Sequence, residues 1–505
     1  MTNIDTITYK SIIDRLKSDE NKQNALNDMK NLLEYKPKPV AASTIKTTGI
    51  SKIVHCLNVP DGIQTNLACE VLKICFEKFE PGEVIKMYTS NIMYLLRHYK
   101  CCVRKLAVDE VYKAVNEDKS LLPVPEYIDV FVAVAHLVCD EDIAVASKAI
   151  LVTSNLPREA YETVLEEMKI ALQGNKSSRC NAYEVIINMS IKEFDLFELC
   201  LAKGYIDTMV SELDSDDVLY RMNVLDLLSQ LAVKPLGLNY FVKCGVLQRI
   251  TDMLTNLQNN PLRGLLAPGY MKFFGSIAHH YPNEIFEKYP ALVDSLFGAF
   301  ESEDVTLVLV ALDTLGFIGS TAEGKMCLAA QGGKYIQSLE KLGQLGKSCT
   351  SEIKVRILRT FADLIGVEKD IESCSKSPNQ QRINLMTREW FRCLSKDPEP
   401  MDKLLSLCKS PFPDIKSAAL TLLDSVCQHT WGEELVAGVA GFIEYLLDRS
   451  IDDNKELKEA RYNIIKRLST SSKFDDNVRE RLQTYVDQGP FFSETQLQVA
   501  MEEGN

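Results

Sequence analysis

The stretch FDLFELCLAKGYIDTMVSELDSDDVLYRMNVLDLLSQLA, residues 194–232, decides the fold. Its apolar residues recur with the spacing of amphipathic helices, and polar corners divide it into three short segments. The first segment ends at Ala202-Lys203-Gly204, where a glycine can adopt the positive φ of a helix stop. The last begins after Ser215-Asp216-Asp217, an acidic cap that can satisfy the free N–H groups of a helix start. The stretch therefore predicts three helices in a fixed order.

The pattern of the last of these helices returns along the chain. It has an acidic or polar start, an apolar residue, a small or apolar residue after three spacers, and an apolar pair near the end. Clear copies occupy residues 141–156, 176–190, 215–232, 303–319, 351–366, 413–427 and 455–469, and weaker ones 62–79 and 102–115. A glycine corner before an amphipathic run recurs at Gly204, Gly245, Gly333 and Gly441. A period of about forty residues is typical of armadillo and HEAT repeats.

A repeat of this kind cannot bury its apolar faces alone, so it must stack on its neighbours. No region alternates with a period of two over a useful length, so no strand is needed. We therefore predict an all-α fold, an armadillo/HEAT-like α-solenoid wound as a right-handed superhelix of about ten to eleven repeats. We expect residues 1–492 to form one continuous solenoid with N-terminal cap helices at 1–40, and residues 493–505 to form an acidic mobile tail. Turn-rich loops are predicted at 257–268 and 373–381.

The overall charge of the chain limits its partners. The 505 residues carry a formal net charge of −13, and the pI is about 5.2. Because nucleic-acid binding requires a dense basic face, this charge argues against a nucleic-acid partner. The acidity either serves solubility or complements a basic surface of a partner. With no apolar secretion segment and no run long enough to cross a membrane, we expect a cytoplasmic or nuclear protein without membrane contact, whose 15 cysteines stay reduced.

The sequence lacks the motifs that would carry chemistry. It has no C-x-x-C or Cys/His quartet with zinc spacing, no Gly-rich phosphate loop and no G-x-S-x-G elbow. The pair His279-His280 has no carboxylate at ligand spacing, so a polar helix end explains it better than a metal site. We predict that the protein is not an enzyme and uses no cofactor, metal or small-molecule substrate. A cleft hidden between repeats is the one arrangement that leaves catalysis open.

The third helices carry the candidate binding residues. In an armadillo stack they line the concave face, and such faces commonly bind partners. Aligning the copies gives two outward positions on each helix, four residues apart. One series opens with the amides of Asn155, Asn188 and Gln230, which can clamp the backbone of a bound segment. We predict a groove that is polar to acidic in its middle and basic toward Arg467, although a solvated helix face would give the same pattern. The candidate partner-binding residues are Asn188, Asp226, Gln230, Lys272, Ser276, Asp313, Phe317, Arg359, Asp363 and Arg467.

Several segments of the second half point to one protein family. They are APGYMKFFGSIA at 267–278, ALDTLGFIGSTAEGKMCL at 311–328, GFIEYLLDRSIDDNKELKEARY at 441–462 and LQTYVDQGPFF at 482–492. Two shorter motifs add to them, Trp390-Phe391 followed by Leu394-Ser395-x-Asp397-Pro398, and Ser410-Pro411-Phe412-Pro413-Asp414. Together these segments resemble the family of assembly chaperones for the proteasome base. The resemblance is dense from Gly204 to Phe492 and rests on the repeat pattern alone before Ser120.

This resemblance implies a function that the spacing of residues does not give. Members of the family are chaperones for the base of the proteasome regulatory particle. They bind the C-terminal domain of one ATPase of the ring, and they dissociate before or as the mature particle forms. The implied partners are the proteasomal ATPase ring subunits and the large base scaffold subunit. ATP hydrolysis would belong to the client ATPase.

A general armadillo-repeat adaptor or a nuclear transport-type scaffold is the alternative. Carriers of that kind place a Trp four residues before the Asn on successive third helices, where it holds basic cargo. In this chain the corresponding positions hold Leu151, Glu184, Asp226 and Lys272. The only two tryptophans, Trp390 and Trp431, lie outside this series. The sequence therefore favours the chaperone over the carrier.

Overall fold

A computed structural model describes residues 2–16, 22–60, 62–259, 261–367, 378–451 and 454–492 of the chain. In these ranges every regular element is a helix and none is a strand, so the all-α prediction is confirmed. The chain divides into two compact units, unit 1 (Met1–Leu231) and unit 2 (Ala232–Asn505). One continuous solenoid over 1–492 stays a prediction, and the tail predicted at 493–505 lies outside the described residues.

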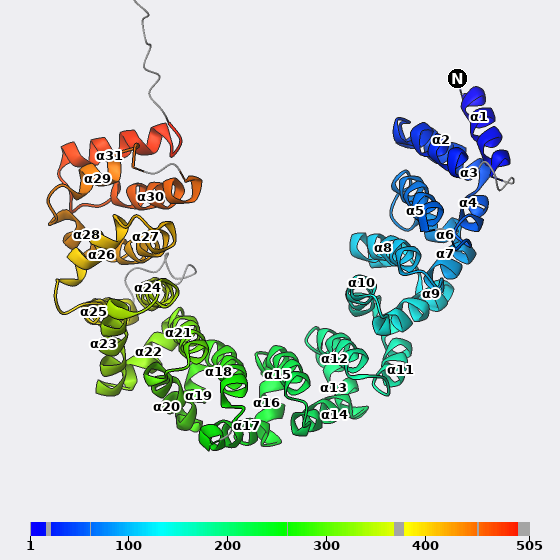
Figure 1. Cartoon of the computed structure of the whole chain (residues 1–505). Coiled ribbons are helices and arrows are strands. Elements are labelled where there is room, and N and C mark those ends of the chain that lie inside the picture. The colour runs from blue at the N-terminus through cyan, green and yellow to red at the C-terminus, as the bar shows by residue number, and fades with distance from the viewer. Residues whose placement is uncertain are drawn as a thin grey trace, which may run out of the picture. The chain divides into compact units, whose positions relative to one another are not determined.

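Unit 1 consists of two layers of helices (Figure 1). In one layer, α2, α5, α8, α10 and α12 pack on one another in chain order. This layer contains α2 (Lys22–Glu34), α5 (Gly62–Glu77), α8 (Cys101–Glu117), α10 (Ile143–Ser154), α12 (Lys176–Ser190) and α15 (Val218–Ala232). The other layer contains α1 (Thr2–Arg15), α3 (Lys38–Thr48), α4 (Ser51–His55), α6 (Glu83–Met87), α7 (Thr89–Leu96), α9 (Val124–His136), α11 (Tyr161–Ala171), α13 (Phe194–Ala202) and α14 (Tyr205–Ser211). The helices predicted within 1–40 are α1 and α2, and the break at Pro37 separates α2 from α3.

Unit 2 repeats this arrangement (Figure 1). Its third helices α18, α21, α24, α27 and α30 pack in one row, each on the next. They are α18 (Arg263–His280), α21 (Val305–Gly319), α24 (Ser351–Ile365), α27 (Pro413–Cys427) and α30 (Lys455–Leu468). The second layer contains α16 (Pro235–Lys243), α17 (Val246–Thr255), α19 (Pro282–Lys288), α20 (Pro290–Gly298), α22 (Ala322–Ala330), α23 (Gly333–Ser348), α25 (Pro378–Arg392), α26 (Pro400–Cys408), α28 (Thr430–Ala437), α29 (Phe442–Leu447) and α31 (Asp476–Gln488).

Each predicted copy of the repeat pattern overlaps a third helix, but no copy was predicted at α18. The copies predicted at 176–190 and 413–427 coincide with α12 and α27. Other copies begin before their helix because the acidic start is an N-cap that stays outside it. The Oδ1 atom of Asp142 accepts from the backbone N–H of Ala144 at 2.9 Å, and that of Asp304 accepts from Thr306 at 2.9 Å. Each cap satisfies a backbone donor at a helix start, which is worth about 1 kcal/mol.

Glycine corners turn the chain between the first and second helices. Gly204, Gly245 and Gly441 have φ of 74°, 69° and 74°, a conformation that other residues rarely adopt, so these three corners are confirmed. The corner predicted at Gly333 is wrong by one residue. Gly332 has the positive φ of 58°, and Gly333 is the first residue of α23. Only one of two adjacent glycines has to make the turn.

The loop predicted at 257–268 is wrong in its second half. After a 3-10 turn, Asn256–Asn259, the helix α18 starts at Arg263 and includes Pro268. A proline within a helix removes one backbone hydrogen bond and costs about 3 kcal/mol. Burial of Tyr270 and Met271, each 1% exposed, offsets this cost. In the loop predicted at 373–381, residues from Pro378 onward are helical, and the preceding ones lie outside the described residues.

Small side chains let the third helices of unit 2 approach closely. A Cβ atom on Gly275 of α18 would lie 2.6 Å from Cγ2 of Thr314 on α21. One on Gly319 of α21 would overlap Leu364 of α24. Between the same two helices, the hydroxyl of Thr360 donates to the carbonyl oxygen of Leu312 at 3.1 Å. These two glycines are therefore a packing requirement, and they fix the spacing of the surface that the row presents.

Candidate partner-binding surface

All ten candidate residues lie on third helices, and each keeps its side chain partly or fully exposed. Residues four apart lie on one face of a helix, so the pairs on α15, α18, α21 and α24 each form one patch. Unit 1 carries Asn188 on α12 and the pair Asp226 and Gln230 on α15. Unit 2 carries the other seven: Lys272, Ser276, Asp313, Phe317, Arg359, Asp363 and Arg467. That these residues bind a partner stays a prediction.

Phe317 is the apolar centre of the surface on unit 2. Its side chain is 44% exposed, although it belongs to a helix that is otherwise mostly buried. The ring of His279, at the end of α18, stacks on it with centroids 3.8 Å apart and planes 5° apart. The Nδ1 atom of His279 lies 2.7 Å from the carbonyl oxygen of Phe317, to which it can donate. His279, predicted only as a polar helix end, thus helps to hold Phe317 in place.

An ion pair crosses from α24 to α21 beside Phe317. The Nη1 atom of Arg356 donates to both carboxylate oxygens of Asp313, at 2.7 and 2.8 Å. Both side chains are partly exposed, so the pair is worth at most about 1 kcal/mol. It nevertheless offsets the negative charge that the sequence assigned to Asp313. The middle of the predicted groove is therefore less acidic there than the candidate residues alone suggested.

Arg359 and Asp363 lie one turn apart on α24. Removal of water by the surrounding protein raises the pKa of the Asp363 carboxyl, and the charge of Asp313 raises it further. Lys325 and Arg359 act in the opposite direction, because their positive charges favour the carboxylate. The buried Lys325 amine donates to the backbone oxygen of Asp363 at 3.0 Å and so ties α24 to α22. Arg359 stays exposed on this patch.

At the far end of unit 2, Arg467 is only partly available to a partner. Its Nε atom lies 3.4 Å from Oδ1 of Asp424 on α27, and both side chains are about one-third exposed. The predicted basic end of the groove is therefore partly neutralised. The comparison of repeat copies within the chain did not predict Arg356 and Asp424, because neither residue occupies one of the two outward positions. A signal existed for Arg356, which precedes Arg359 by three residues and so shares its face.

The amide series in unit 1 begins with a residue whose side chain already forms hydrogen bonds within the protein. The Nδ2 atom of Asn155 donates to the carbonyl oxygen of Leu151 at 3.0 Å, and its Oδ1 accepts from the Lys192 amine at 2.9 Å. Burial lowers the pKa of Lys192 to about 8. Asn155 is the C-cap of α10, and its side chain serves that helix end. Asp226 and Gln230 of α15 are instead exposed.

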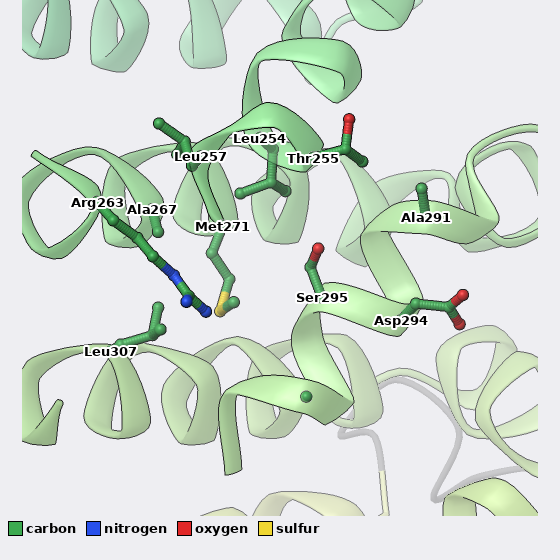
Figure 2. A pocket seen from close by; sticks show the side chains of 11 residues that line it. Leu254, Thr255, Leu257, Arg263, Ala267, Met271, Ala291, Asp294, Ser295 and Leu307 are labelled. Atoms are coloured by element: carbon green, nitrogen blue, oxygen red, sulfur yellow. The ribbon is translucent and has the colours of Figure 1, made fainter. Parts of the chain in front are cut away.

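A cavity of about 420 Å³ opens between successive repeats of unit 2 (Figure 2). Helices α17, α18, α20 and α21 supply its walls. The sequence was compatible with a cleft between repeats but did not predict where it lies. Its lining is Leu254, Thr255, Leu257, Arg263, Ala267, Met271, Ala291, Asp294, Ser295, Gly298 and Leu307.

The described ranges hold no cluster of metal-binding side chains and no single membrane-spanning helix. No group of three or more His, Cys, Asp or Glu side chains that could hold a metal ion occurs there. In the same ranges no single helix combines the length and apolar composition of a membrane span. The pair α21 and α22, bent by 113°, passes that test only when the two are taken together.

Comparison with known proteins places the chain in a family. The model of the family described as proteasome non-ATPase 26S subunit matches residues 6–505. The chain belongs to this family. Its curated relatives include the 26S proteasome non-ATPase regulatory subunit 5 of Bos taurus, 26% identical over 491 residues, or 94% of this chain and 95% of the relative. The protein of that name from Homo sapiens is 27% identical and covers 90% of each chain, and that from Drosophila melanogaster is 27% identical and covers 94% and 97%. The family resemblance of the quoted segments is confirmed.

Solved structures support the solenoid. Yeast importin-β aligns with a TM-score of 0.56 and 10% identity, over 93% of this chain and 63% of that one. Because the sequence identity is only 10%, this similarity shows the fold and nothing about function. The tryptophans of this chain are core residues of the second layer, Trp390 on α25 and Trp431 on α28, which are 1% and 5% exposed. The family and the fold favour a protein that binds rather than one that catalyses.

Proposed function

We propose that this protein is an assembly chaperone for the base of the 26S proteasome regulatory particle. It binds the C-terminal domain of one proteasomal ATPase subunit, meets the large base scaffold subunit in the same assembly intermediate, and dissociates before the mature particle forms. It acts in the cytoplasm or the nucleus. The family match over residues 6–505 is the observation that carries this proposal. The same match supports a role for both units.

The exposed surface of unit 2 supports binding to a folded protein domain. Protein interfaces commonly centre on an aromatic anchor surrounded by charged and polar residues. Phe317 provides such an anchor and is pre-positioned by the ring of His279. Asp313, one helical turn before it on α21, pairs with Arg356 of α24, and Arg359 on the same α24 adds positive charge. A partner that covers Phe317 would bury apolar area without having to order a mobile side chain first.

A physical mechanism follows from binding at this surface. A solenoid that covers the C-terminal domain of an ATPase keeps that domain from docking elsewhere too early. It also holds subunits of the intermediate at high effective concentration for the next joining step. Release requires that the finished assembly compete for the same surface or exclude the chaperone sterically. Such coupling is a difference in affinity between two assembly states.

Binding to purified C-terminal domains of the individual proteasomal ATPases tests this function. The parent chain should bind one of them in a pull-down and by calorimetry. The double variant Phe317→Ala with Arg359→Glu should bind that domain at least about tenfold more weakly, because removing a central aromatic anchor commonly costs 2 kcal/mol or more. Arg382→Glu is the matched control. It makes the same charge change in unit 2, on the exposed surface of α25 in the second layer.

The two parts of the proposal fail separately. If the parent chain binds none of the ATPase domains, the chaperone function is wrong. If it binds one and the double variant binds equally well, the function stands and the surface around Phe317 is the wrong place. Equal weakening by Arg382→Glu would show a general charge effect.

A further inference from the structure

The cavity between α17, α18, α20 and α21 is apart from the surface around Phe317. Most of its wall is apolar, with Leu254, Leu257 and Met271 among the contributors. Its volume of about 420 Å³ is within the range of about 300–1,000 Å³ typical of ligand pockets. All of its lining belongs to unit 2, so the site is complete within one compact unit.

One positive charge faces this apolar space. Figure 2 shows the guanidinium of Arg263 directed into the space that Met271 and Leu307 also line. Among the described residues no ion pair neutralises it. The carboxylate in the lining, Asp294, points away from Arg263 and pairs with Lys334 of α23 instead. Arg263 can therefore pair with an anion that enters the cavity.

A second polar side chain that lines the cavity is that of Ser295. The hydroxyl of Ser295 on α20 points into the space across from Arg263 and can donate to an anionic oxygen (Figure 2). Gly264 and Asp304 lie close together at the starts of α18 and α21, since a Cβ on Gly264 would lie 3.0 Å from the Asp304 carboxylate, which caps α21. The neighbours of these two residues, Leu265 and Val305, leave 60% and 46% of their surface exposed. Two exposed apolar side chains thus lie at the starts of the helices that carry Arg263 and Leu307.

These features select one kind of occupant. Arg263 and the apolar residues line the same space, so an occupant that satisfies both carries an anion and an apolar group together. The last residue of a polypeptide carries both, an α-carboxylate and a side chain on one Cα atom. An internal Asp or Glu would place its own charged side chain in the cavity and leave the apolar wall uncovered.

We propose that this cavity binds the free C-terminal residue of a partner polypeptide. Arg263 holds the carboxylate in a charge-assisted pair with help from Ser295, and the wall around Met271 and Leu257 holds an aliphatic side chain. The preceding residues of the partner lie along Leu265 and Val305. This site is independent of the surface around Phe317 and adds a second contact to the protein.

Fluorescence anisotropy with the full-length chain tests the proposal. The probe is a labelled octapeptide of Gly and Ser that ends in Leu with a free carboxylate, and its partner probe is the same peptide as the C-terminal amide. The free acid should bind at least about tenfold more tightly than the amide, because a hydrogen-bonded charge pair is lost in the amide. Arg263→Gln should remove this preference, and Arg382→Gln, on α25, should keep it.

A second variant fills the cavity without disturbing the fold. Gly298 lines the cavity, and a Cβ there would meet nothing within 4 Å, so Gly298→Leu places an aliphatic chain in open space. It should abolish peptide binding while leaving helicity and melting as in the parent. Gly333→Leu is the matched control, because Gly333 also has nothing within 4 Å and does not line the cavity.

Four results would overturn the proposal: no binding of the free acid, equal binding of acid and amide, an unaffected Arg263→Gln variant, or an unaffected Gly298→Leu variant. Binding of dodecanoate with the same dependence on Arg263, without binding of the peptide, would assign the cavity to a fatty acid. The double variant Phe317→Ala with Arg359→Glu should retain peptide binding, which separates this site from the proposed ATPase contact.

Discussion

Replacement of Gly324 by Ala tests how tightly the layers of unit 2 are packed. Gly324 lies in the first turn of α22, and a Cβ there would overlap the carbonyl oxygen of Ile318 and lie 2.8 Å from the hydroxyl of Thr321. That hydroxyl accepts from the Gly324 N–H at 3.1 Å and caps the helix. Overpacking costs about 1–3 kcal/mol, and loss of a cap about 1 kcal/mol. The better helix propensity of Ala returns about 1 kcal/mol, so we expect a net loss of about 2 kcal/mol.

Tryptophan fluorescence reports the loss of stability of unit 2. Both tryptophans of the chain are buried in unit 2, so the red shift of their emission in urea follows unfolding of that unit alone. With an m value of about 3 kcal/mol/M, a loss of 2 kcal/mol lowers the urea midpoint by about 0.7 M. Gly298→Ala is the control, since its Cβ has open space; it should raise the midpoint slightly through helix propensity. A Gly324→Ala midpoint equal to or above that of the parent would refute the packing argument.

Three further predictions concern unit 2. Ala311→Asp should unfold it at a cost of several kcal/mol, because Ala311 is 0% exposed and the new carboxylate would have no partner; circular dichroism and tryptophan emission check this. Burial lowers the pKa of His429 to about 4, below the unfolded value of about 6.5. The contribution of the neutral ring to the free energy of unfolding is therefore fully present above a pH of about 6.5 and is lost as the pH falls toward 4. Urea titrations should show a loss of up to about 3 kcal/mol over that range, and His429→Asn should reduce it; an equal slope in the variant would exclude His429 as the cause. A double-mutant cycle on Arg356→Ala and Asp313→Ala should give a coupling of about 0.2–1 kcal/mol that shrinks in salt, and a coupling unchanged by salt would contradict an exposed ion pair.

The sequence predicted the elements that depend on local chemistry. The third helices follow from apolar spacing and acidic caps, as Asp142 and Asp304 show, and three of the four proposed corners follow from the freedom of glycine. Errors arose where packing overrides local preference. Pro268 predicts a loop, yet it lies within α18 because the residues that follow it are buried in the core.

The candidate surface was predictable only in part. Alignment placed ten residues on exposed positions of third helices, but it could not show which charges they meet on neighbouring helices. Asp313 pairs with Arg356 and Arg467 with Asp424, at separations of 43 residues in each case. Such pairs depend on the offset between stacked helices, which the period of the repeat does not give. The cavity beside Arg263 was missed for the same reason, because its walls come from four helices of successive repeats.

Isolation of the protein from cell extract under native conditions, with mass spectrometry of everything that accompanies it, tests the central claim most directly. An assembly chaperone should carry one or more proteasomal ATPases and the large base scaffold subunit, and should lack the subunits of the core particle. Recovery with complete proteasomes in constant proportion would instead show a permanent subunit, and recovery without any proteasomal ATPase would contradict the proposed function.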